Sequence, residues 1–468
     1  MHIARKIRPI RGIAILVALT TAMLLAACGG GNNVAQNPMP PSPTGSPGST
    51  AISVNVGDAP SDRVIAFELT INSIVLTRSD NSTVSLLSTP RRIEVTHLAG
   101  TSEPLVLSSV PQGSYTSATI SVSAPEVVFI DNTGRPVERE FPTFSKTVTV
   151  NFNPPLSVGT TPLVLTLDAN VGASVSIDPV SGTVTVNPTF NIANLPLPAA
   201  GHDDDQRPEN GELEHIVGQV TSISASSFTI KLGQSGVTMT FNVNSQTRFD
   251  DFGSLSALPA NALVRVEGVT QQDGTLLAKE VELLAGEAME AEGLVTSVTG
   301  NPATSFTFVI HDGAGTMLNA GMLGTTVTVT VDSRTEFTVD PDNIDLSALS
   351  LPAFSASTIS KGQRVEAESE VENEHGMTGT VRRVKLEQQA LTGTVSALSG
   401  GQFTLTVADD SAFKLLTGKS TITVFTQRNT EVRNLTVSNG LSVRVRGLLF
   451  FDPSRATYTL VAGRITNP

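Results

Sequence analysis

Cys28 is the only cysteine among the 468 residues, and its thiol is the side chain with the most distinctive chemistry. It follows a basic start (Arg5 to Arg11) and an apolar run that ends in Leu25-Ala26-Ala27. A basic start, an apolar segment and small residues before a cut are typical of a secretion signal. The run is shorter than the roughly 20 residues that a membrane-spanning helix needs. We therefore expect residues 1–27 to be removed, which leaves Cys28 as the new N-terminus.

Leu25-Ala26-Ala27-Cys28 resembles the bacterial lipobox, in which the thiol carries lipid with fatty acyl chains such as palmitate. The resemblance implies a protein of the bacterial cell envelope that is attached to a membrane through lipid on Cys28. Two or three buried acyl chains hold a protein firmly, whereas one binds only marginally. Gly29 to Gly31 stand where inner-membrane lipoproteins often carry Asp, so the resemblance implies the outer membrane or the cell surface.

Other motifs carry less chemistry. Leu416-Thr417-Gly418-Lys419-Ser420 is similar to the end of a phosphate-binding loop, but Phe413 stands where that motif requires Gly. We therefore interpret it as a surface turn. The six histidines do not show metal-site spacing, and no Gly-x-Ser-x-Gly elbow occurs. We expect no catalytic residue, no metal ligand and no cofactor.

Two acidic stretches keep a calcium-binding alternative open. Asp203 to Asp205 lies in a polar run, and Asp340 to Asp345 offers oxygen donors without the spacing of a calcium loop. A solvated spacer and a polar loop are the simpler interpretations. Carboxylates are also numerous enough that a hydrolase with an unrecognised acidic pair stays an alternative.

The charge of the chain is strongly negative. The net charge is −13, and removal of residues 1–27 takes away four basic side chains, which gives about −17. Because nucleic-acid affinity comes largely from neutralising phosphates, we expect no nucleic-acid partner. An envelope protein or a glycan is the kind of partner that we expect instead.

Composition indicates an all-β protein in several domains. Val, Thr and Ser are plentiful, there is no Trp, and only two Tyr occur. Residues 28–50 form a Pro/Gly/Ser-rich tether, and residues 193–214 form an acidic linker. These two segments separate a first domain, residues 51–192, from the remainder.

The first domain shows apolar and polar residues in alternation, which predicts half-buried strands. Turn clusters at Asp131 to Gly134 and Asp178 to Gly182 separate them. About seven short strands with such turns predict a two-sheet β-sandwich. The predicted strands are 51–56, 66–76, 115–123, 147–152, 163–168, 174–177 and 183–186.

Two segments carry a resemblance. A strand leads into Gly57-Asp58-Ala59-Pro60, and Val110-Pro111-Gln112-Gly113-Ser114 leads into Tyr115 at the start of another strand. Together they resemble transthyretin-like sandwiches and an uncharacterised bacterial lipoprotein family that begins with Asp-Ala-Pro. The resemblance implies a fold and no active site. Tyr115 is expected in the sandwich core or at its corner.

The remaining chain is a threefold repeat, at residues 215–286, 287–388 and 389–468. The units begin alike, at Val217-Gly218, Glu292-Gly293 and Thr392-Gly393, and each then has a Phe-Thr strand. Five strands per unit predict a small OB-like β-barrel, and the pattern resembles an uncharacterised bacterial β-barrel repeat. The second unit carries insertions. Phe228, Phe306 and Phe403 recur once per unit and are expected in the cores, and the units are expected to behave as separate beads.

Taken together, these patterns favour a non-enzymatic, lipid-anchored envelope or surface protein that acts in scaffolding, adhesion or ligand capture. Two alternatives stay open, a carbohydrate- or calcium-binding module and a hydrolase. Sugar sites usually stack on Trp or Tyr, and this chain has few such rings. The ligand is not specified by the sequence, because a fold does not determine a function.

Overall fold

The structure is a computed structural model. It describes residues 48–59, 62–96, 103–178, 181–195, 197, 212–232, 236–250, 252–284, 289–314, 324–339, 341, 344–347, 349–369, 379–433 and 435–468. Within these ranges no helix combines the length and the apolar character needed to cross a bilayer. The fold is all-β, as the composition predicts, and the helices α1 and α2 among the described residues are short.

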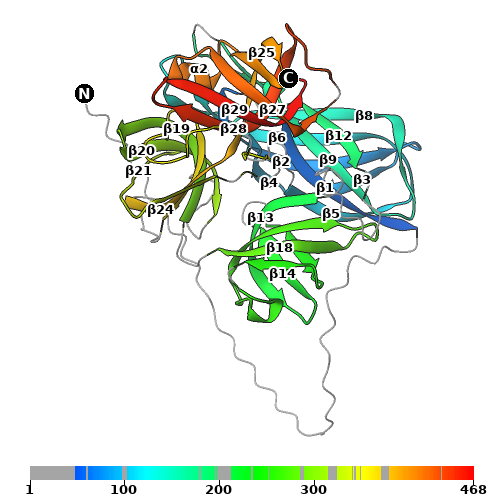
Figure 1. The fold of residues 1–468 in the computed structure, drawn as a ribbon. Coiled ribbons are helices and arrows are strands. Elements are labelled where there is room, and N and C mark those ends of the chain that lie inside the picture. Colours follow the sequence, from blue (N-terminus) through cyan, green and yellow to red (C-terminus); the bar gives the residue numbers. More distant parts are fainter. Residues whose placement is uncertain are drawn as a thin grey trace, which may run out of the picture. The chain divides into compact units, whose positions relative to one another are not determined.

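The first sheet of the N-terminal domain has the order β12-β9-β1-β5 (Figure 1). β1 (Ser49–Ala59) pairs antiparallel with β5 (Glu103–Pro111) and parallel with β9 (Leu163–Asn170). β12 (Phe190–Leu195) adds to the other edge of β9. A parallel pair needs a crossover connection, and here the second sheet lies between β1 and β9 in the chain.

The second sheet is built around two long strands, β2 (Val64–Arg78) and β6 (Gly113–Ile130), which pair antiparallel. On the edge away from this pairing, each long strand pairs with two further strands, one after the other along its length. β3 (Thr83–Leu87) and β4 (Arg91–Glu94) pair with β2, and β7 (Pro136–Glu140) and β8 (Ser145–Val158) pair with β6. A helical turn, α1 (Val171–Ser174), and a small ribbon of β10 (Val175–Ile177) and β11 (Val184–Val186) complete the domain.

One apolar core joins the two sheets, which confirms the predicted sandwich. Tyr115 is fully buried in it, and its hydroxyl donates a hydrogen bond to the Pro111 carbonyl at 2.7 Å. This is the corner arrangement expected from the sequence. The sequence pattern missed five strands of this domain: β3, β4, β5, β7 and β12. β7 was missed because its Val137-Glu138-Arg139-Glu140 segment is almost wholly charged and exposed.

The first repeat forms a ring of five strands in the order β15-β14-β13-β17-β18, closed by a short parallel pairing of β15 with β18. A sixth strand, β16 (Arg248–Asp250), pairs parallel with β18. A 3-10 turn, η2 (Leu255–Ala257), lies in the longer connection after it. The ring strands are β13 (Glu212–Ile223), β14 (Ser227–Leu232), β15 (Thr238–Asn242), β17 (Leu263–Thr270) and β18 (Leu276–Leu284).

The second repeat copies this topology. Its ring is β21-β20-β19-β23-β24 with β21 paired parallel to β24, and β22 (Glu336–Val339) is the added strand. The ring strands are β19 (Met289–Gly300), β20 (Ala303–Ala314), β21 (Thr326–Thr330), β23 (Arg364–Ser369) and β24 (Gly379–Leu386).

The third repeat is a closed barrel in the order β25-β26-β27-β29-β28. One long strand, β27 (Thr421–Val432), takes both positions that separate strands occupy in the earlier repeats. A short helix, α2 (Ala412–Thr417), precedes it. The other strands are β25 (Gln388–Ser399), β26 (Gln402–Val407), β28 (Ser442–Asp452) and β29 (Thr457–Thr466).

The repeated glycine in the first strand of each barrel has a steric reason. Gly218, Gly293 and Gly393 hold corresponding positions beside the second strand. A Cβ on Gly293 or Gly393 would lie less than 3.0 Å from the carbonyl oxygen of Val309 or Thr406, respectively. The strands of a small barrel must bend and approach closely here, and glycine permits that approach.

We expect Gly393→Ala to destabilise the third barrel by about 1–3 kcal/mol, because the added methyl collides with backbone rather than with a movable side chain. Gly253→Ala is the matched control, since a Cβ there meets no atom within 4 Å. Chemical unfolding of both variants checks this prediction. Equal stability of the two variants would contradict the steric explanation.

The repeats do not behave as separate beads throughout. Phe228, Phe306 and Phe403 are each 1% exposed, which confirms the predicted core positions. However, the core cluster of the second repeat also contains side chains from β28 and β29 of the third: Leu448, Phe450 and Val461. The expectation failed because sequence repeats indicate which units recur and do not indicate whether their outer faces are apolar.

Candidate functional site

Four glutamates stand directly opposite one another across four strands of the second sheet of the sandwich. Glu94 on β4 faces Glu68 on β2, Glu68 faces Glu126 on β6, and Glu126 faces Glu140 on β7. Residues directly opposite in an antiparallel ladder share one face of the sheet. We call these four residues, together with Glu138 two positions from Glu140 on that face, the glutamate row.

The alternation of the strands explains why the row points away from the sandwich core. Phe67 and Leu69 flank Glu68 and are fully buried in the core, and Val127 next to Glu126 is buried there too. Because successive side chains of a strand alternate between faces, the glutamates lie on the opposite face. The row grades from buried (Glu94 and Glu68) through half-buried (Glu126) to exposed (Glu138 and Glu140).

Like charges directly opposite one another destabilise a sheet, so the row needs compensation. Arg92 supplies part of it. Its Nε lies 2.6 Å from Glu68 Oε2, and its Nη2 lies 3.0 Å from Glu126 Oε2. Glu94 is held by backbone amides, since its Oε1 accepts hydrogen bonds from the amides of Phe67 on β2 and of Thr96 at 2.8 and 2.9 Å.

Glu68 is the member of the row whose buried charge is least compensated. The residue is 5% exposed, and its Oε1 is buried without a hydrogen-bond partner. Burial, opposed by the Arg92 charge and reinforced by the Glu126 charge, raises the pKa of Glu68 to about 7. Burial also raises the pKa of Glu126, and the charges of Glu138 and Glu140 raise it further. The row therefore holds more negative charge than its protein neighbours stabilise.

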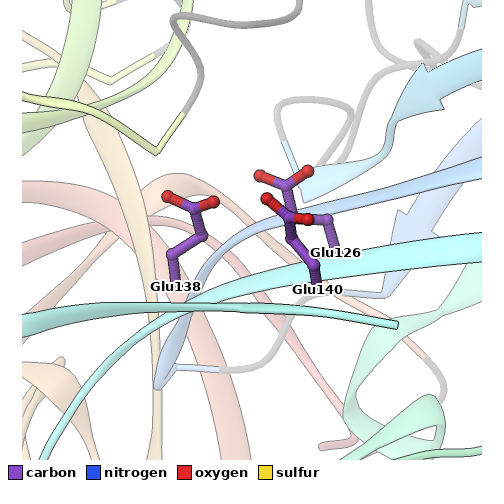
Figure 2. Close-up of side chains that lie close together, drawn as sticks. All are labelled: Glu126, Glu138 and Glu140. Carbon is purple, nitrogen blue, oxygen red and sulfur yellow. The ribbon is translucent and has the colours of Figure 1, made fainter. Parts of the chain in front are cut away.

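The outer end of the row forms a carboxylate cluster. Glu126, Glu138 and Glu140 each offer one oxygen, and these three oxygens lie within 4.8 Å of one another. Figure 2 shows the three carboxylate groups gathered on the same side of the strands. Two oxygens that bind one calcium ion at 2.3–2.6 Å from opposite sides are about 5 Å apart, so this spacing suits a shared ion.

Calcium fits the donor set best among common cations. Hard carboxylate oxygens suit Ca²⁺, which tolerates varied coordination geometry, whereas Mg²⁺ demands near-ideal octahedral geometry at shorter distances. Zinc prefers nitrogen and sulfur ligands, and the cluster offers neither.

Several residues that the sequence singled out do not join this cluster. Cys28, Asp203 to Asp205 and Asp340 lie outside the described residues. Asp345 is exposed and accepts hydrogen bonds from Ser347 in a local turn. Leu416 and Thr417 are the last residues of α2, and Leu416 is buried. Only Gly418, with its left-handed backbone, Lys419 and Ser420 form an exposed turn before β27 begins.

One histidine of the six has a described side chain. His311 on β20 is 3% exposed and lies 3.0 Å from Glu292 Oε1, with Arg364 beside it. Its ring is therefore part of a polar network of the second barrel. His215 lies on β13, and nothing is described of its side chain.

The glutamate row was not recognised in the sequence, although one signal was present. The Asp131 to Gly134 segment predicts a turn, and a hairpin around it places Ile130 opposite Pro136. Counting outward from that pair puts Glu126 opposite Glu140. The pairing of β6 with β2 is long-range, so Glu68 could not be placed in the same way.

A cavity of about 90 Å³ lies elsewhere among the described residues. Its lining includes Asp62, Thr96, His311, Arg364 and Gln389. Ligand pockets typically measure about 300–1,000 Å³, so this cavity suits a few waters better than an organic ligand. None of the row's five glutamates lines it.

Comparison with known families gives one partial match. Residues 217–282 match the family described as Domain of unknown function (DUF5666). The match covers most of the first barrel, from within β13 to most of β18, and leaves the sandwich and the row outside it. No curated protein matches the chain.

Two solved structures resemble the chain weakly. The first is described as Drosophila Unr CSD456, with 14% identity, a TM-score of 0.12, and coverage of 54% of this chain and 97% of that one. The second is a multidomain protein with nucleic acid binding domains from Streptococcus pneumoniae TIGR4, with 13% identity and a TM-score of 0.12. It covers 53% of this chain and 72% of that chain.

The expected exclusion of nucleic acid is corrected by these findings. The similar structures include a protein with nucleic acid binding domains, so the exclusion does not stand. That expectation was based on the net charge of the whole chain, which hides local regions of opposite charge. Residues 389–468 carry eight Lys and Arg against four Asp and Glu, although the chain as a whole is acidic. A TM-score of 0.12 gives no argument for such a partner here.

Proposed function

We propose that this protein is a non-enzymatic, lipid-anchored envelope protein whose N-terminal sandwich binds calcium through Glu126, Glu138 and Glu140. The single observation that carries the calcium proposal is the register of the sheet. That register places four glutamates in one row and a fifth beside them, with Arg92 as the arginine that contacts two of them.

Electrostatics support a bound cation. A pair of opposite charges on neighbouring strands stabilises a sheet by about 0.2–1 kcal/mol, whereas a pair of like charges directly opposite destabilises it. A divalent ion at the outer end would turn the repulsion among three carboxylates into attraction. Calcium is a reasonable ion for a protein displayed outside the cytoplasm, where extracellular modules bind it at Kd values of about 10⁻⁴–10⁻³ M.

The anchoring part of the proposal is supported by the sequence features around Cys28 and by the tether that follows. The Asp58-Ala59-Pro60 and Tyr115 segments support the likeness of the sandwich to transthyretin-like domains of bacterial lipoproteins. The hydrolase alternative has less support. Its acidic pair would need a cleft, and the row lies on a sheet face whose outer members are exposed.

Isothermal titration of the chain without residues 1–27 and with Cys28→Ser tests the calcium proposal. We expect one calcium ion per chain with a Kd between about 10⁻⁵ and 10⁻³ M. Glu138→Gln/Glu140→Gln should weaken binding at least tenfold. The matched control is Glu336→Gln, an exposed strand glutamate that faces Arg383 in the second barrel. Equal weakening by the control, or no calcium binding by the parent chain, contradicts the proposal.

Anchoring is tested separately on full-length protein made in a bacterium with lipoprotein-processing enzymes. Intact-mass measurement should show loss of residues 1–27 and an added diacyl or triacyl mass on Cys28. Cys28→Ser should prevent both changes. An unmodified thiol in the parent protein would refute the anchor without affecting the calcium site.

A further inference from the structure

We propose that this protein forms a homodimer in which β8 of the sandwich pairs antiparallel with β8 of a second copy of the chain. Three features point to it: a long strand with one edge that no other described strand pairs with, a stretch of that strand without charge, and side chains that match themselves across a two-fold axis. The inference does not depend on the calcium site.

The first feature is the position of β8 in its sheet. It pairs with β6 along its length, and among the described strands it has no other partner. In a strand with one antiparallel neighbour, alternate N–H and C=O groups point away from that neighbour. Side chains 147–153 alternate between exposed and half-buried. The outer edge of β8 is therefore a template on which another strand can pair.

The other edges of the two sheets carry features that oppose such pairing. Native proteins protect edge strands by charge, by proline or by short length. β7, on the same edge of β6, contains three charged residues in succession, and β5 has proline at its second and last positions. β3, β4 and β12 have four to six residues. Residues 147–153 of β8 contain no charged residue, Pro or Gly.

The lysine of β8 does not protect this edge. Lys146 Nζ lies 2.6 Å from Asn187 Oδ1 and 2.9 Å from the carbonyl oxygen of Pro188. Asn187 and Pro188 come shortly before β12, the edge strand of the other sheet. The ammonium group of Lys146 is therefore held by the opposite sheet, and an approaching strand does not meet its charge.

The sequence of the uncharged stretch suits a second copy of itself. Residues directly opposite in an antiparallel pair share one face of the sheet. A two-fold axis at the centre of residues 147–153 would therefore place polar side chains against polar ones and apolar side chains against apolar ones. The opposed pairs are Thr147 with Asn153, Val148 with Phe152, Thr149 with Asn151, and Val150 with its own copy.

A second copy would also cover apolar surface. Val148, Val150 and Phe152 pack against the sandwich core but stay half-buried at the margin of the sheet. The same three side chains of the second copy would lie beside them and extend the core across the axis. Copies of a chain with a net charge of −13 repel one another, so close approach costs least along an uncharged stretch.

Sedimentation velocity tests the dimer, on the chain without residues 1–27 and with Cys28→Ser, in the presence of a calcium chelator. A strand-edge interface is smaller than that of an obligate dimer, so we expect a Kd of about 1–100 µM. Thr149→Lys/Asn151→Lys should weaken the dimer at least tenfold, because lysines of the two copies then stand opposite each other. Both positions are exposed in the single chain.

Thr149→Lys/Asn151→Glu is the matched control. It places two charges at the same positions, but each Lys of one copy faces a Glu of the other, so the dimer should persist. A parent chain that stays monomeric up to about 1 mM would overturn the inference. Equal affinities of the two variants would also overturn it, because the proposed register requires them to differ.

Hydrogen exchange locates the interface and separates lost pairing from lost folding. Outward amides of β8 are open to solvent in the monomer and hydrogen-bonded in the dimer, so a rise in parent concentration across the Kd should slow exchange within residues 147–153 at least tenfold. Residues 136–140 of β7 should be unchanged, and both variants should keep the protection of β2 and β6. No slowing within residues 147–153 would overturn the inference, wherever else protection rises.

Discussion

Glu138→Gln/Glu140→Gln should melt at a higher temperature than the parent in calcium-free buffer, and calcium should no longer raise its melting temperature. Both substitutions remove charges that repel Glu126 and each other. Each like-charge contact costs about 0.2–1 kcal/mol, so without calcium the unfolding free energy of the variant should exceed that of the parent by about 1 kcal/mol. The parent should gain about 2.7 kcal/mol at calcium concentrations of 100 Kd.

The measurement is thermal unfolding of parent and variant with a chelator and with calcium. The order of stabilities should therefore invert: the variant is more stable without calcium, and the parent is more stable with it. Glu336→Gln provides the control, because it removes one exposed strand glutamate from another domain and should leave the calcium response intact. A double variant that is less stable under both conditions would contradict the electrostatic origin.

The sandwich should lose stability between pH 5 and pH 8 in the absence of calcium, and Glu68→Gln should remove much of that loss. Burial raises the pKa of Glu68 from 4.5 to about 7. Between these values the folded state binds more protons than the unfolded state, so unfolding becomes easier as pH rises. The contribution of Glu68 is fully present below pH 4.5 and is lost as pH rises through about 7.

The expected size is about 2–3 kcal/mol, since each pKa unit corresponds to about 1.4 kcal/mol and solvent screens part of the effect. Tyr458→Phe leaves Tyr115, which is buried in the sandwich, as the sole tyrosine reporter in a chain without Trp. Urea unfolding followed by its fluorescence then reports the sandwich alone. The comparison is between Tyr458→Phe and Tyr458→Phe/Glu68→Gln, each unfolded at about pH 5 and about pH 8. If Glu68→Gln leaves the change of unfolding free energy with pH unaltered, the prediction is wrong and other groups, such as Glu126 or Asp168, cause the pH dependence.

The sandwich and the repeated barrels were predictable because their signals are local. Alternation marks strands one at a time, and the recurring glycine and Phe-Thr segments mark the repeat. The core positions of Phe228, Phe306 and Phe403 follow from that recurrence. The recurring glycine was visible as well, although its reason, a carbonyl oxygen of the next strand, is a contact that only the closed ring creates.

The glutamate row was not predictable as a whole, because its strand pairings join residues that are separated by very different distances along the sequence. Glu126 and Glu140 meet through one hairpin, and their register follows from a recognisable turn. Glu68 joins them through a pairing between β2 and β6, which no local pattern specifies. Strand β7 itself has too few apolar residues to look like a strand. The acidic runs that are visible in the sequence are contiguous, whereas this cluster is assembled from residues of separate strands.

The core that the second and third repeats share limits how the chain can be divided into fragments. A truncation after Leu386 follows the repeat units, yet it removes Leu448, Phe450 and Val461 from the apolar cluster of the unit that remains. The shortened chain would expose the apolar side chains that these residues cover and would tend to aggregate. A fragment that keeps residues 289–468 together avoids that exposure, because both sides of the shared core are then present.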